Sequence, residues 1–183
     1  MKTVVLSSAV LAFFLGGAVI AVEPEISAGV NGIKLPVKTQ KLVQDGPHIY
    51  AGVLDGSNSQ LRMIVSIATQ RIYLVRDNQV AFDTPISSAA PGFRTPRGSF
   101  VLKEKIRDGK MSNLYKCPMP FWMRIGQTEF GLHEAELPGY PASHGCIRLP
   151  KESAQLIFDH LSVGTPVEIV NSWSPRRAAA LQR

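Results

Sequence analysis

Residues 60–86 read QLRMIVSIATQRIYLVRDNQVAFDTPI. Over residues 60–67, apolar side chains alternate with polar ones, and this period of two is typical of a half-buried β-strand. Similar runs follow at 71–76 and 79–86, and the pair Asp77-Asn78 between them is typical of a tight turn. The stretch therefore predicts two or three antiparallel strands in a meander.

Short runs downstream of this meander predict further strands. The loop at 91–98, rich in proline and glycine, leads into a strand near 99–105. Residues 122–125, 129–133 and 165–170 have the same strand-like character. We therefore expect a mainly β domain.

One segment has a helical period instead. Its apolar side chains recur at the spacing that places them on one helix face, and Pro150 suits its first turn and Gly164 its end. These apolar residues are Ala154, Ile157, Phe158 and Leu161. The sequence thus predicts a single short amphipathic helix near the end of the domain.

The length of 183 residues, 45% of them hydrophobic, suits one domain with a substantial core and is short for two. We expect this domain to span residues 60–171. Residues 22–59 form a loosely structured lead-in segment that packs one short strand against it. The basic tail, residues 172–183, has too little apolar periodicity to belong to the core.

The N-terminal segment predicts export. Lys2 precedes an almost purely apolar run over residues 4–22, and Ala21 stands before an acidic segment, as in a secretory signal peptide. We expect residues 1–21 to be removed and the protein to act in the periplasm or cell envelope. The run is also about as long as a membrane-spanning helix, so association with the membrane through an uncleaved anchor is the alternative.

The charge pattern gives little indication of nucleic-acid binding. The formal charge of +6 becomes +5 without Lys2, because 19 basic residues then remain with 14 acidic ones. These basic residues are spread along the chain, which favours a solvated surface. A mildly cationic exported protein is, however, attracted to anionic envelope polymers and lipid surfaces.

Residues 143–149, Ser-His-Gly-Cys-Ile-Arg-Leu, place Cys146 directly after a His-Gly pair. A thiol attacks a carbonyl only as the thiolate, so it needs a nearby base, and His133 can supply one. Gly145 allows a tight turn that directs N–H groups at a developing oxyanion. The pattern predicts a cysteine nucleophile with His133 acting first as base and then as acid.

Two neighbouring roles stay open on the residues alone. The ring of His133 needs an orienting group, which can be the carboxylate of Glu134 or Glu136 or a backbone carbonyl. Arg148 can hold a substrate carboxylate through two hydrogen bonds, or it can pair with a local acid such as Glu152.

Two rival uses of the same residues also stay open. Cys117 is the only other cysteine, and a Cys117–Cys146 disulfide, which an oxidising compartment favours, would silence the nucleophile. Zinc is the second rival, but the spacing of its candidate ligands fits no familiar zinc pattern. Those candidate ligands are His133, His144 and Cys146. We therefore expect no metal and no cofactor.

The segment His133–Leu149, with its Ser-His-Gly-Cys-Ile-Arg motif, resembles the active-site signature of the L,D-transpeptidase (YkuD) catalytic domain. Residues 70–74, 86–88 and 91–100 are similar to the other characteristic stretch of that family. The resemblance covers residues 60–171 and implies a sandwich-like, mainly β domain with one short helix after the nucleophile.

The resemblance also implies a role for each position of the motif. Cys146 becomes the acylated nucleophile, His133 the general base, and the backbone carbonyl of Glu134 the group that orients His133. The resemblance places Gly145 in the oxyanion hole and His144 in the wall of the site. It gives Ser143 and Arg148 a role in substrate binding.

Members of this family act on the cell wall, which implies peptidoglycan stem peptides as partners. The thiolate would attack the diamino acid carbonyl of a tetrapeptide stem and release the terminal D-alanine. An amine of a second stem, or a lysine of an outer-membrane protein, would then resolve the thioester. Water as acceptor would instead make a carboxypeptidase or hydrolase, and a disulfide-linked chain would be a non-catalytic wall-binding protein.

Two departures from the family pattern concern the region between the histidine and the motif. The loop from His133 to Ser143 is shorter than in many members, and Glu134 stands where a small residue is frequent. A shorter loop changes the cap over the substrate cleft. The choice of acceptor is therefore the property that the resemblance leaves open.

Overall fold

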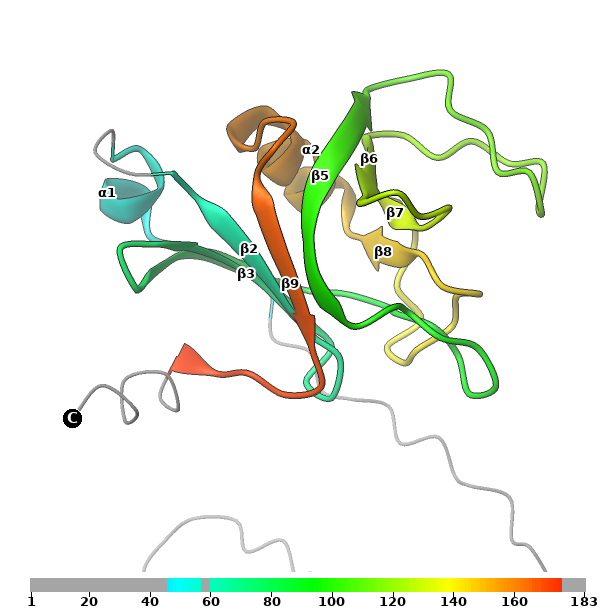
Figure 1. Cartoon of the computed structure of the whole chain (residues 1–183), viewed down its shortest axis with the longest axis horizontal. Helices are drawn as coiled ribbons and strands as arrows, with labels where there is room; N and C mark the ends of the chain where they lie inside the picture. Colours follow the sequence, from blue (N-terminus) through cyan, green and yellow to red (C-terminus); the bar gives the residue numbers. More distant parts are fainter. Residues whose placement is uncertain (1–45, 57–59, 176–183) are drawn as a thin grey trace, which may run out of the picture. The chain divides into compact units, whose positions relative to one another are not determined.

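The computed structural model describes residues 46–56 and 60–175 (Figure 1). The expected signal segment, 1–21, lies outside the described residues, as do most of the lead-in segment and the end of the tail. The described part is mainly β, as predicted, and it contains one more helix than expected, the short α1. The elements are β1 His48–Ile49, α1 Ala51–Leu54, β2 Arg62–Ser66, β3 Arg71–Arg76, β4 Gln79–Pro85, β5 Gly98–Ile106, β6 Trp122–Ile125, β7 Gly131–Glu134, β8 Ile147–Leu149, α2 Lys151–His160 and β9 Pro166–Val170.

The predicted meander is confirmed. Strands β2, β3 and β4 pair antiparallel in sequence order. The turn between β3 and β4 has Asp77 at φ +47° and Asn78 at φ +63°, a conformation that short polar residues adopt more readily than most. Strand β9 then joins the other edge of β2 in parallel, a pairing that the sequence pattern did not indicate.

One strand connects the two halves of the sheet, whose order is β1-β4-β3-β2-β9-β5-β6-β7-β8. Residues 98–101 of β5 pair with β9, whereas residues 102–106 pair with β6 after a shift of register between Leu102 and Glu104. Such an irregularity bends a strand and increases its twist. Figure 1 shows β5 as a long, strongly curved strand between β9 and β6, so the sheet curls.

The core lies where the curled sheet and α2 meet. Met63 and Leu74 from the meander, Ile125 from β6 and Ile147 and Leu149 from β8 are all fully buried there. Burying side chains of this size contributes about 1.5–3 kcal/mol each before the cost of chain entropy is counted. The strands that carry the cysteine motif are therefore held by the same core as the meander.

Helix α2 confirms the predicted amphipathic face, because Ala154, Ile157 and Phe158 are buried. Its ends differ from the prediction. Pro150 is the N-cap with an extended ψ of 149°, not a first-turn residue, and the helix ends at His160, well before Gly164. Gly164 has φ +94° and lies between the helix and β9. Neither helix in residues 46–56 and 60–175 is long and apolar enough to cross a membrane.

The two flanking segments contact the domain. His48–Ile49 of the lead-in segment pairs with β4, which is the short strand expected there. At the start of the tail, the partly buried Trp173 packs against the outer face of the meander, with its ring 4.6 Å from that of Tyr73. An isolated aromatic residue gives no periodic pattern, so the sequence does not predict this contact.

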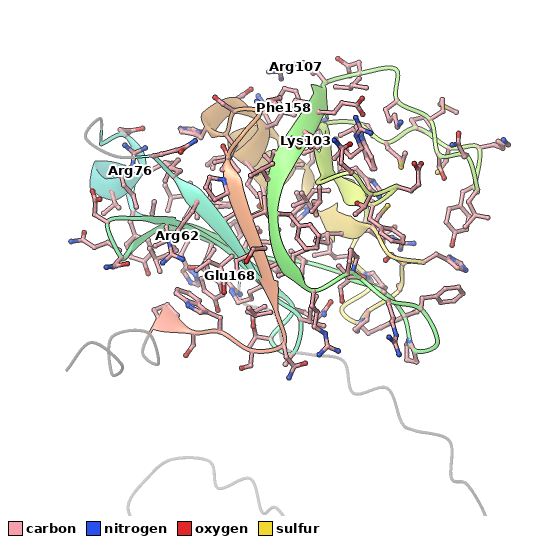
Figure 2. All side chains as sticks on the ribbon, viewed as in Figure 1. Arg62, Arg76, Lys103, Arg107, Phe158 and Glu168 are labelled. Carbon is pink, nitrogen blue, oxygen red and sulfur yellow. The ribbon has the colours of Figure 1, made fainter. Side chains whose placement is uncertain are left out.

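Lys105 of β5 stabilises the end of α2. Its Nζ donates hydrogen bonds to the carbonyls of Phe158 and Leu161 and lies 4.3 Å from the Phe158 ring centre. A cation at a helix C-terminus satisfies carbonyls that have no partner within the helix and interacts favourably with the helix dipole. Arg107 lies 5.0 Å from the same ring, and Figure 2 shows it beside Phe158 at this end of the domain.

We expect Lys105→Met to lower the free energy of unfolding by about 1–3 kcal/mol, because it keeps the apolar stem but removes a charged donor from two carbonyls. Urea denaturation followed by circular dichroism measures this change. Lys103→Met, at an exposed position of the same strand, is the matched control and should stay within about 0.5 kcal/mol of the wild type. Equal effects of the two substitutions would contradict the capping role.

Candidate active site

The parallel pairing of β7 with β8 brings the predicted catalytic residues together. His133 on β7 is the register partner of Arg148 on β8, and Cys146 precedes β8 directly. Residues two apart in an extended chain project to the same face. All three side chains line one pocket of about 600 Å³. Two segments that are 13 positions apart in the sequence thus meet at one site.

The ring of His133 is oriented by a backbone carbonyl. Its Nδ1 lies 2.8 Å from the carbonyl oxygen of Glu134, so Nδ1 carries the hydrogen and Nε2 is left as the basic nitrogen. Burial lowers the pKa of His133 below its ordinary value of 6.5, and the positive charge of Arg148 lowers this pKa further, against the bond to Glu134. The ring is therefore neutral near pH 7 and able to accept a proton.

Cys146 is a partly buried, free thiol. Burial raises its pKa, while a hydrogen bond from the Gly131 backbone and the charges of Arg148 and Lys110 act in the opposite direction. A thiol with a raised pKa beside a histidine with a lowered one forms a neutral pair. In a pair of this kind, a thiolate forms when the histidine accepts the proton of the thiol.

The hydroxyl group of Ser143 makes two hydrogen bonds within the turn before Cys146. Ser143 Oγ donates to the Cys146 carbonyl at 2.5 Å and accepts the Gly145 N–H at 3.0 Å. Ser143 is buried, at 4% exposure, and these two bonds support the turn. Ser143 also lines the pocket, and its role in substrate binding stays a prediction.

Gly145 cannot be replaced without a clash. Its φ is +149°, and a Cβ at this position would lie 2.2 Å from a ring carbon of Phe130. The Phe130 ring thus occupies the space where any other residue at position 145 would carry a side chain. The tight turn that the motif predicts is therefore confirmed.

A second segment, residues 87–95, supports the motif from the side of the meander. Ser87 exchanges two backbone hydrogen bonds with Arg148, of 3.1 and 3.0 Å, and the Ser88 carbonyl accepts the N–H groups of Ala142 and Ser143. Thr95 Oγ1 donates to the Gly145 carbonyl at 2.9 Å. The loop predicted at 91–98 therefore reaches the back of the nucleophile turn.

Arg148 and His144 both line the pocket. Arg148 donates to the Ala142 carbonyl at 3.2 Å and takes part in no ion pair among the described residues, so the pairing with Glu152 is not formed. His144 is exposed, and its ring lies 3.8 Å from that of Phe93 and 5.2 Å from that of Tyr115. His144 therefore forms part of the pocket rim, in agreement with a wall position.

Sequence reasoning missed one wall of the pocket. This wall comes from the long connection between β5 and β6. The connection has no period and no motif, so only the composition of residues 110–119, with two methionines and an exposed Tyr115, could have drawn attention to it.

The geometry also concerns the two rival uses of these residues, a Cys117–Cys146 disulfide and a zinc site. Cys117, in the same connection, lines the pocket as a free, exposed thiol, so no disulfide to Cys146 is present in this structure. Within residues 46–56 and 60–175, no group of three or more His, Cys, Asp or Glu side chains is placed to hold a metal ion.

Comparison with known proteins identifies the domain. A model of the L,D-transpeptidase catalytic domain (YkuD) matches residues 60–169. L,D-transpeptidase 1 of Mycobacterium tuberculosis is 29% identical over 123 residues, which cover 58% of this chain and 49% of that protein. This chain therefore spans about half the length of that curated relative.

Solved structures of L,D-transpeptidases have the same fold. The Enterococcus faecium enzyme is 28% identical, with a TM-score of 0.56 over 61% of this chain and 50% of that chain. LdtMt1 in complex with imipenem is 27% identical, with a TM-score of 0.57 over 60% of this chain and 58% of that chain. Because the family model matches most of the domain built above, on a fold that these enzymes share, the chain belongs to the L,D-transpeptidase (YkuD) catalytic domain family.

Proposed function

We propose that this protein is an exported L,D-transpeptidase that uses Cys146 to form a thioester with peptidoglycan tetrapeptide stems. One observation carries the proposal: Cys146 and a His133 ring oriented by the Glu134 carbonyl line the same pocket. A nucleophile, a proton shuttle and an oxyanion hole are sufficient for this chemistry, so no step needs a cofactor.

The acylation step follows from the protonation states of the pair. His133 Nε2 takes the proton of Cys146 as the sulfur bonds to the diamino acid carbonyl. When this tetrahedral intermediate collapses, the bond to the D-alanine nitrogen breaks, and His133 returns the proton to that leaving amine. A thioester and free D-alanine result.

The oxyanion needs donors that the turn has not already used. The Gly145 N–H donates to Ser143, so the expected contribution of this group requires that bond to open. The Cys146 N–H meets no acceptor among the described residues. We therefore assign the Cys146 N–H as the first oxyanion donor, with the N–H of His144 beside it.

Deacylation decides between the two catalytic alternatives. An amine of a second stem, or a lysine of an outer-membrane protein, attacks the thioester, loses a proton to His133 and displaces the Cys146 thiolate, which His133 reprotonates. Water in place of the amine gives a hydrolase. Arg148, which carries a charge without an ion pair at the pocket wall, is suited to bind a stem carboxylate in either case.

We expect Cys146→Ala to abolish covalent modification by both imipenem and a disaccharide tetrapeptide. Imipenem is a suitable probe because a relative binds it and because opening its ring leaves the whole molecule on the sulfur. Intact-mass spectrometry of the reduced protein measures both adducts, and chromatography of the soluble products measures D-alanine, tripeptide and cross-linked dimer.

The products distinguish the alternatives. D-alanine with dimer establishes transpeptidation, and D-alanine with tripeptide alone establishes hydrolysis. Cys117→Ala tests the second thiol, and peptide mapping shows which cysteine carries the adduct. An adduct on Cys117 alone, or none on the wild type, would contradict the proposal.

We expect the rate of acylation in mildly acidic solution to stay close to its value at neutral pH. His133 acts as a base only when it is unprotonated, and its pKa lies below 6.5, so the acid limb of kcat/KM should also lie below pH 6.5. Arg148→Gln removes a charge that lowers this pKa, so the limb should move to higher pH. The pH dependence of imipenem acylation, measured for the wild type and for Arg148→Gln, gives the acid limb of each.

Arg94→Gln is the control for the loss of one positive charge. Arg94 is exposed and does not line the pocket, so its removal should leave the acid limb in place. A limb at or above pH 6.5 in the wild type, or equal shifts in both variants, would show that the neutral His133–Cys146 pair is wrong.

A further inference from the structure

We propose that Thr95 is a positioning residue that aims the Cys146 N–H at the oxyanion. The inference rests on the proposed function, because it concerns the acylation step at the same site. Thr95 lies outside the pocket wall and 50 positions before Gly145, the residue that its hydroxyl contacts. Any effect on chemistry must therefore pass through the backbone.

The first step of the argument is the geometry of one peptide unit. The Gly145 carbonyl and the Cys146 N–H belong to the same planar peptide, and this peptide is trans. In a trans peptide the two groups point in opposite directions. Thr95 Oγ1 holds the carbonyl at 2.9 Å on the buried side, so the N–H points away from Thr95.

The second step is that, within residues 46–56 and 60–175, no other hydrogen bond is made to this peptide unit. Ser143 bonds the N–H of Gly145 and the carbonyl of Cys146. These two groups belong to the peptides before and after the one that joins Gly145 to Cys146. Gly145 is the residue with the widest backbone freedom, and it stands at φ +149°. Without Thr95, the peptide between Gly145 and Cys146 has no hydrogen bond among the described residues and can rotate.

Thr95 is itself held in place, as a positioning role requires. It is buried, at 8% exposure, and its Oγ1 also accepts the Ala89 N–H at 3.1 Å. This second bond uses an oxygen lone pair and leaves the hydroxyl hydrogen for the Gly145 carbonyl. A bond to the carbonyl also polarises the peptide, which makes the Cys146 N–H a stronger donor.

The test compares a reaction that needs an oxyanion hole with one that does not. Attack on the imipenem carbonyl develops an oxyanion, whereas alkylation by iodoacetamide displaces iodide without one. Thr95→Val removes the hydroxyl and keeps the shape. We expect it to slow imipenem acylation of Cys146 about tenfold to a hundredfold, less than the loss of a whole oxyanion donor, and to leave alkylation of Cys146 unchanged.

Two further variants separate positioning from stability. Thr95→Ser keeps the hydroxyl and should restore acylation to within about threefold of the wild type. Thr84→Val removes the hydroxyl of another fully buried threonine, which bonds Ser153 at 2.7 Å, and should leave acylation unchanged. If Thr95→Val does not fold, as judged by circular dichroism, Thr95→Ala replaces it with the same expectation.

The outcomes are distinct. Normal acylation by folded Thr95→Val or Thr95→Ala overturns the inference and leaves the proposed function intact. Equal slowing of acylation and alkylation also overturns it, because a displaced sulfur would slow both reactions. If the wild type forms no imipenem adduct and releases no D-alanine from the tetrapeptide, the proposed function fails and the inference falls with it.

Discussion

The turn at residues 143–146 is the constraint on which the site depends. Gly145 adopts φ +149°, and the Phe130 ring occupies the space where a Cβ would lie. A backbone conformation of this kind persists only when its surroundings determine it. Here the surroundings are the Ser143 hydroxyl on one side and Thr95 on the other. Strand β8 begins directly after Cys146, so the turn connects Cys146 to the core.

Burial has opposite effects on the pKa values of His133 and Cys146, the proposed catalytic pair. It favours the neutral form of each, so it lowers the pKa of His133 and raises that of Cys146. The resting thiol is thereby less reactive than a thiolate toward oxidants, which matters for an enzyme proposed to act outside the cytoplasm. Cys117, which is exposed at the same pocket, lacks this burial.

The curled sheet explains how distant segments form one pocket. Strand β5 leaves its pairing with β9 and continues beside β6, which carries the second half of the sheet across the core. Three connections then meet at His144: the His144 ring, in the motif itself, contacts Phe93 of the loop and Tyr115 of the long connection. The rim is therefore shared by three connections.

The amino-acid sequence by itself determined the elements with strong local patterns: the meander over residues 60–86, the face of α2, and the motif around Cys146 with His133 as its partner. The alternation of apolar and polar residues, helical spacing and a glycine in a tight turn are local properties, so they can be recognised in the sequence. Only the tertiary structure decided the parallel pairing of β7 with β8, the packing of Trp173, the pocket wall at 110–119 and the hydrogen bond from Thr95. These contacts join segments far apart in sequence, and no local pattern encodes a partner that long-range packing selects.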